Sequence, residues 1–185
     1  QVATEEFPDA VLPVKGMGDW AIVSTSKPYS LSSMWEGRTR SDYYKVSFAT
    51  GERTQIAEAD YAGYRLSPAG KYVGTYNATD SCWYTINLAD NRKIQLTAPQ
   101  TFPAWDEDND VPNYPSPHGM AGWTKDDAAL LIYDRYDIWS FDPEGKKAPM
   151  RLTKDGREKQ VTYRRIVLDR EQMDIDLKQP MMLTG

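Results

Sequence analysis

The sequence predicts an all-β chain, and more specifically a fragment of a β-propeller with about three to four antiparallel four-stranded blades. Residues 124–153 indicate a meander: a short apolar run at 129–133, an alternating run at 138–141 and a short strand at 150–152, joined by turns. From the second position on, residues 137–142 also match residues 82–87 position by position, and residues 42–47 match residues 82–87. A sheet unit repeated in this way is typical of radial or stacked β architecture.

Composition limits the classes of function. The 185 residues are 40% hydrophobic and 12% aromatic, which suits a packed β core, and the formal net charge is −5. Because phosphate contacts need clustered Lys and Arg, and the chain has no basic run, we expect no nucleic-acid partner. No apolar run approaches the roughly 20 residues that span a bilayer. A single cysteine, Cys82, excludes an internal disulfide, and we expect no cofactor.

The expected units are 11–57, 61–97, 120–153 and an incomplete unit at 161–185. In the first unit, residues 11–14 are predicted to form an innermost strand and residues 20–23 the next strand. Residues 24–40 contain Pro28, Gly37 and several serines, so we expect a loop here, with Trp35 packed beneath it. Strands near 64–66, 71–76, 83–88 and 93–96 are expected to form the second unit.

A long insertion at 98–120 precedes the third unit. It carries five prolines and is predicted to be an ordered but irregular loop. After the third unit we expect a charged turn at 154–159, a strand at 163–168 and the start of another strand at 180–183. Because stacked units cover one another's apolar faces, an unfinished fourth unit predicts a piece of a longer protein whose open sheet ends self-associate.

The densest acidic run contains the candidate binding residues. Asp106, Asp108 and Asp110 alternate as in a calcium loop, but Val111 occupies the glycine position and Pro117 the position of the bidentate Glu, so we expect no metal site. Three interpretations remain: a solvated acidic loop, a weak cation site, or an electrostatic handle for the amino end of a substrate. Arg164 is a further candidate for an inward-facing contact with a carboxylate, and because adjacent strand residues lie on opposite faces, at most one of Arg164 and Arg165 would face inward.

We expect no catalytic residues. His118 is the sole histidine and lies in a loop without a nucleophile elbow, and the nearest look-alike, residues 70–74, has Tyr72 where Ser is required. Cys82 has no second soft ligand nearby in the sequence and is predicted to be a small buried hydrophobe. The aromatic residues Tyr44, Tyr84 and Trp139 occupy equivalent positions and are predicted to pack between sheets.

Residues 67–73, 122–127, 133–139 and 143–149 carry a family resemblance. They resemble the blades of the β-propeller domain in the prolyl oligopeptidase and dipeptidyl peptidase IV-like serine peptidases, in particular secreted or periplasmic members of the Bacteroides type. The resemblance extends over nearly the whole chain. The S-P-x-G-K-x-[VI] pattern at 67–73 also occurs in TolB-like and other non-catalytic propellers.

The resemblance implies a propeller that gates or positions peptide substrate for an α/β-hydrolase domain of the same parent chain, with no membrane span and a periplasmic or extracellular location. The catalytic residues would then lie outside this chain. Family members also use a Glu pair to hold a peptide amino terminus, but Glu5-Glu6 lacks the matching surroundings, and that role is not transferred. The alternatives are a TolB-like protein-interaction propeller and a ligand- or carbohydrate-binding β domain without peptidase activity.

Overall fold

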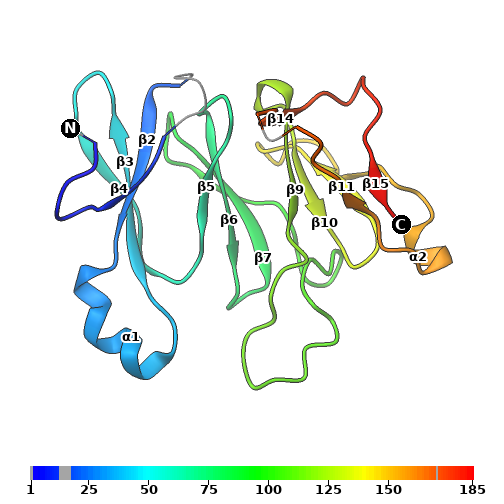
Figure 1. Ribbon diagram of the computed structural model, residues 1–185, viewed down its shortest axis with the longest axis horizontal. Helices are drawn as coiled ribbons and strands as arrows, with labels where there is room; N and C mark the ends of the chain where they lie inside the picture. Colours follow the sequence, from blue (N-terminus) through cyan, green and yellow to red (C-terminus); the bar gives the residue numbers. More distant parts are fainter. Residues whose placement is uncertain (1, 13–17, 170) are drawn as a thin grey trace. The chain divides into compact units, whose positions relative to one another are not determined.

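The computed structural model describes residues 2–12, 18–169 and 171–185, and Figure 1 shows its strands and short helices. The chain forms two compact units, Gln1–Thr75 with Ile86–Arg92 and Tyr76–Thr85 with Lys93–Gly185. Within the described residues, no helix is long and apolar enough to cross a membrane.

The first sheet has the order β1-β2-β3-β4, with antiparallel pairing between neighbours in the sequence. Its strands are β1 (Asp9–Val11), β2 (Trp20–Thr25), β3 (Ser41–Ser47) and β4 (Arg53–Asp60). Strand β2 is buried on both faces: Ala21 and Val23 pack with Phe7 and Val46, whereas Ile22 joins a second apolar cluster. This alternation follows from the two-residue period of a strand.

The other sheets continue the same meander. The second has the order β5-β6-β7-β8, and the third has the order β12-β11-β10-β9-β14. The strands of the second sheet are β5 (Tyr64–Leu66), β6 (Tyr72–Asn77), β7 (Cys82–Asn87) and β8 (Lys93–Gln95). Those of the third are β9 (Met120–Thr124), β10 (Leu130–Tyr133), β11 (Ile138–Phe141), β12 (Met150–Arg151) and β14 (Asp174–Ile175). The predicted fold class, an all-β propeller fragment built on antiparallel four-stranded sheets, is confirmed, and the third sheet adds a fifth strand, β14, which pairs with β9 in parallel.

The turn between β5 and β6 of the second sheet is repeated between β9 and β10 of the third. Ser67 Oγ accepts the N–H of the residue five positions later at 3.0 Å, and Thr124 Oγ1 does the same at 2.8 Å. Three positions after each hydroxyl, the backbone has a left-handed conformation, with φ of 71° at Gly70 and 57° at Asp127. The residues that carried the resemblance therefore share one local geometry, in which a hydroxyl binds across a turn.

The outer pair of strands closes in the same way in both copies. Thr97 Oγ1 accepts the N–H of Trp83 at 2.8 Å, and Thr153 Oγ1 accepts the N–H of Ile138 at 2.9 Å. In each copy the leucine before the threonine donates its own N–H to the carbonyl of that same strand residue, at 2.8 Å. The alignment of residues 82–87 with 137–142 is therefore an alignment of hydrogen bonds as well as of residue types.

The loop predicted at 24–40 is wrong, because this segment is helical. It forms a 3₁₀ turn, η2 (Lys27–Tyr29), followed by the helix α1 (Ser30–Glu36). Pro28 suits the first turn of a helix, and Gly37, with φ of 65°, ends it. Trp35 is not packed beneath the segment; it is 91% exposed.

Several shorter predictions are also corrected. The charged turn at 154–159 contains a four-residue helix, α2 (Gly156–Lys159). Of residues 163–168, only β13 (Arg164–Arg165) is a strand; it pairs with β15 (Leu183–Thr184), which lies slightly beyond the expected 180–183. The innermost strand expected at 11–14 ends at Val11, and residues 13–14 lie outside the described residues. Pairing of β14 with β9 was not predicted.

Candidate functional site

The candidate site lies in the second unit, where residues 98–119 form a long loop. Trp105 and Pro117 form an isolated antiparallel bridge, Asp106 donates its N–H to Ser116 O at 2.8 Å, and His118 donates its N–H to Ala104 O at 2.9 Å. These bonds hold the base of the loop together. The prediction of an ordered but irregular insertion is confirmed.

An ion pair ties the acidic run to the β10–β11 turn. The guanidinium of Arg135 contacts both carboxylate oxygens of Asp108, at 2.9 Å and 2.7 Å. This hydrogen-bonded carboxylate raises the pKa of Arg135. Because the Asp108 side chain is 69% exposed, we assign the pair a positioning role and not a large share of the stability.

The β10–β11 turn is organised by Asp134, whose side chain is buried. Its Oδ1 accepts the N–H groups of Tyr136 and Asp137, and its own N–H binds Asp137 O at 3.0 Å. Its Oδ2 accepts the indole N–H of Trp139 at 3.1 Å. The turn predicted at residues 134–135 is therefore held by the buried carboxylate of Asp134, whose two oxygens both accept hydrogen bonds from residues of the same hairpin.

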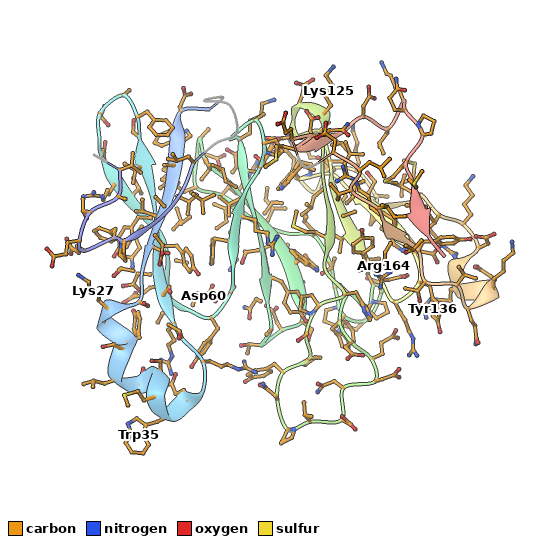
Figure 2. All side chains as sticks on the ribbon, viewed as in Figure 1. Lys27, Trp35, Asp60, Lys125, Tyr136 and Arg164 are labelled. Carbon is orange, nitrogen blue, oxygen red and sulfur yellow. The ribbon has the colours of Figure 1, made fainter. Side chains whose placement is uncertain are left out.

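Arg164 reaches the same turn from β13. Its guanidinium donates to the backbone carbonyls of Tyr163 at 2.8 Å and of Asp134 and Arg135 at 3.2 Å, and it lies 4.6 Å from the centre of the Tyr133 ring. Burial lowers the pKa of this guanidinium. Arg164 and Tyr136 are both labelled in Figure 2. The hydrogen bonds of Arg164 thus go to carbonyl oxygens, and the predicted contact with a carboxylate is replaced by a turn-fixing role.

Tyr136, at the tip of the turn, contributes an aromatic surface between two cations. The guanidinium of Arg135 lies 5.5 Å from the centre of its ring, and that of Arg157 lies 5.2 Å from it. Arg157 is also 3.6 Å from Asp134 and 4.0 Å from Glu107. Sequence analysis did not identify Arg135, Tyr136 or Arg157 as site residues. The only available signal was the opposite charge of these arginines and of the acidic insertion, and no spacing in the sequence connects the two.

His118 lies close to this charged group. Its pKa is lowered, mainly by burial and then by the positive charge of Arg164. Its Nε2 atom is buried and has no hydrogen-bond partner within the described structure. His118 is therefore predominantly neutral near pH 7.

The structure brings together some of the predicted binding residues. Asp108 and Arg164 both attach to the 134–137 turn, whereas Asp106 stabilises its own loop by accepting the N–H of Asp108 at 3.1 Å. Asp106 and Asp110 are exposed. Within the described part of the chain, no group of three or more His, Cys, Asp or Glu side chains is placed to hold a metal ion.

Two other predictions concern strand residues at equivalent positions. Cys82 is buried, its thiol donates to Asp80 O at 3.2 Å, and burial raises its pKa, which confirms the expected small buried group. Tyr44, Tyr84 and Trp139 are half-buried; the ring of Tyr44 packs against Phe7 with ring centres 5.1 Å apart, and that of Trp139 packs against Phe102 at 5.3 Å. The polar ends of two of them also bind the carboxylate before their strand, Tyr84 to Asp80 at 2.6 Å and Trp139 to Asp134 at 3.1 Å.

Comparison with known proteins gives matches among solved structures but no family assignment. No family model matches the chain, and no curated protein matches it. Among solved structures, the chain is similar to the β-propeller domain of the Trilobed protease from Pyrococcus furiosus, described as having an open velcro topology. The identity is 13% and the TM-score is 0.44; the match covers 78% of this chain and 43% of the other, so this chain spans less than half of that domain's length.

Proposed function

We propose that this chain is a non-catalytic propeller segment of a serine peptidase related to the prolyl oligopeptidase and dipeptidyl peptidase IV-like family, and that it helps to gate or position peptides for an α/β-hydrolase domain of the same parent. The proposal includes a periplasmic or extracellular location for the parent. Its support is the recurrence of one turn geometry at Ser67 and Thr124, within the segments that carry the family resemblance.

One observation supports peptide contact by this segment. The bidentate Asp108–Arg135 pair fixes the acidic loop, and Asp106 and Asp110 on either side of it remain exposed. A protonated amino terminus forms its strongest hydrogen bonds with carboxylates, and a fixed loop loses less conformational entropy on binding. The loop is therefore suited to the amino end of a peptide.

Calorimetric titration of the chain with a short peptide, with and without N-acetylation, tests this contact. The free amine should bind more tightly, and Asp106→Asn with Asp110→Asn should remove that preference. Asp90→Asn, a change at an exposed aspartate of the first unit, is the matched control. Equal binding of the free and acetylated peptides would exclude recognition of the amine.

The gating role is tested separately in the parent protein. Its gene should encode a further domain with Gly-x-Ser-x-Gly followed by Asp and His. In the parent, Arg135→Ala should loosen the loop. If this variant cleaves large peptides that the wild type excludes, the result would support gating. A parent without a hydrolase domain would instead favour the TolB-like interaction module.

A further inference from the structure

Two backbone hydrogen bonds close the base of the long loop at residues 98–119. The N–H of His118 donates to Ala104 O at 2.9 Å, and the N–H of Asp106 donates to Ser116 O at 2.8 Å. These bonds join the two arms of the loop just before the acidic run begins. The position of that run therefore depends on the backbone around His118.

Arg164 lies close to the same base. Directly after His118, Gly119 O accepts the N–H of Tyr133 at 3.1 Å, and the Arg164 guanidinium lies 4.6 Å from the centre of the Tyr133 ring. Arg164 also donates to two backbone carbonyls of the 134–137 turn, each at 3.2 Å. The loop base, the end of β10 and this turn are thus connected around His118 and Arg164, all within the second unit.

The imidazole of His118 keeps one ring nitrogen away from both water and protein partners. Its Nε2 atom is buried, and no described residue forms a hydrogen bond with it. A neutral imidazole can carry its proton on the other nitrogen. An imidazolium carries a proton on both nitrogens, so charging the ring would create a buried N–H without an acceptor. A buried donor of this kind is costly, and more so when it is charged.

The charges around His118 act in opposite directions. Asp106 and Glu107 of the loop and Asp134 of the turn favour the imidazolium, whereas Arg164 of β13 disfavours it. Burial and Arg164 outweigh the three carboxylates, so the pKa of His118 is lowered. A histidine with a lowered pKa in the closed state takes up a proton when the base opens. The closed state therefore loses stability as the pH falls below the ordinary histidine value of about 6.5.

We propose that His118 is a pH-sensitive switch, which keeps the base of the 98–119 loop closed at neutral pH and opens it when the ring is protonated in mild acid. Opening gives the Nε2–H group water as an acceptor and moves the new positive charge away from Arg164. The consequence for binding rests on the proposed function: an opened base no longer fixes the acidic run, so the loop should release the amino end of a peptide.

The switch is directly measurable because His118 is the sole histidine. By NMR, its imidazole C–H resonance should titrate with a midpoint below about 6.5. From about pH 7.5 to about pH 5.5, the protection of the Asp106 N–H against hydrogen exchange, corrected for the intrinsic rate, should fall at least about threefold. Carboxylates of ordinary pKa stay ionised over this window. The N–H of Trp83, which is bound to Thr97, should keep its protection.

Two variants and a matched control identify the group responsible. In His118→Gln, the protection at Asp106 should not change over this pH window. Arg164→Gln should raise the midpoint of His118, and Lys125→Gln, at an exposed cation of the same unit, should leave it unchanged. A wild-type midpoint at or above about 6.5 would overturn the proposal even where a variant fails to fold. Equal losses of protection in the wild type and in His118→Gln would overturn it as well.

A peptide titration separates the switch from the proposed function. The wild type should bind a free-amine peptide more weakly at the lower pH, whereas His118→Gln should bind it equally at both values. If neither protein binds the peptide at either pH while the protection at Asp106 still follows the titration of His118, the peptide role is wrong and the opening of the loop stands. If binding weakens equally in both proteins, release through His118 is wrong.

Discussion

Residues 82 and 137 occupy the same place in two copies of the repeat, yet one is Cys and the other Asp. Both side chains are buried, and in both copies the next residue donates its N–H to a threonine hydroxyl. The thiol of Cys82 makes local contacts with Asp80 O and with the Gln95 side chain. The carboxylate of Asp137 instead accepts hydrogen bonds from the segment that follows strand β12.

The contacts of Asp137 show how one residue extends a repeated unit. Its carboxylate accepts the Thr153 hydroxyl at 2.7 Å, Arg151 at 2.7 Å, and the N–H groups of Gly156 at 3.1 Å and Arg157 at 3.2 Å. It therefore satisfies the first N–H groups of α2, the helix that replaced the predicted charged turn. The repeated hydrogen bonds hold the strands of each sheet together. The change from a thiol at position 82 to a carboxylate at position 137 attaches the following segment, which begins with α2, to the third sheet.

Asp137→Asn should produce the largest loss of stability. The amide group keeps the shape, but its NH₂ must face either Arg151 and the N–H of Arg157 or the Thr153 hydroxyl and the N–H of Gly156, and the buried negative charge that faces Arg151 is lost. We expect a loss of about 3 kcal/mol in the free energy of unfolding, measured by urea denaturation. Arg151 remains a quarter exposed, which limits the cost.

Cys82→Ser is the matched control for that change, because a hydroxyl can keep both contacts of the thiol. Its cost should be under about 1 kcal/mol, since the volume changes little. Equal losses for Asp137→Asn and Cys82→Ser would contradict the view that only the third sheet uses this position to fasten the next segment.

The two closing threonines give a smaller and graded effect. Thr97→Val should cost about 1–2 kcal/mol, because the N–H of Trp83 loses its acceptor in a buried setting. Thr153→Val should cost more, because Thr153 also donates to Asp137. Thermal and urea unfolding of both variants would measure the difference, and a larger loss at Thr97 would show that the carboxylate contact adds nothing.

Sequence repetition predicted the parts of the molecule that depend on local hydrogen bonding. The match of residues 82–87 to 137–142 predicted both strands, and the apolar run at 129–133 predicted the fully buried strand β10. These elements follow from the two-residue period of the side chains and from turn residues that the sequence displays directly.

What escaped prediction depends on contacts between distant residues. Helix α1 has no apolar face turned to a core, and its last residue, Glu36, is held by Arg40 and Tyr61. At the candidate site, Asp108 was predicted as a binding residue because it lies in an acidic run. Its partner Arg135 lies 27 positions away in the sequence, and no periodicity connects the two residues. Arg164 was expected to meet a carboxylate and instead binds carbonyls of a turn whose position depends on the fold.

The hairpin turns of the first two sheets provide a finer test of equivalence. Gly51 and Asn91 both have left-handed backbones, with φ of 73° and 61°, and each N–H binds the carbonyl four residues earlier at 2.8 Å. Gly51→Ala should cost about 1 kcal/mol from backbone strain, because the space around Gly51 is open. Gly51→Asn should cost less, since asparagine tolerates this conformation. Equal costs for the two changes, measured by thermal denaturation, would argue against equivalent turns.

The smallest expected effect is a pH dependence confined to the third sheet. Hydrogen bonding to Arg151 lowers the pKa of Glu158 from 4.5 to about 2. A carboxylate whose pKa is lower in the folded state stabilises the fold above its unfolded pKa, and this stabilisation is lost as the pH falls from about 4.5 toward 2. Asp155, whose pKa is lowered by Lys159, acts in the same direction. Hydrogen exchange at the N–H of Gly156, which is bound to Asp137, should therefore accelerate over this window beyond the intrinsic pH effect.

Glu158→Gln separates this contribution from general acid destabilisation, because it removes the titrating group while Asp137 still holds Arg151. In that variant the acid-induced change at Gly156 should become smaller. Exchange at the N–H of Trp83, which is bound to Thr97 in the second sheet, should respond to acid equally in the variant and the wild type. Because Glu158 is exposed, the effect should also shrink as salt is added. If acid accelerates hydrogen exchange equally at Trp83 and at Gly156, the acid-induced loss of stability is shared by the second and third sheets. That result would contradict an effect confined to the third sheet, where Asp137 binds Arg151.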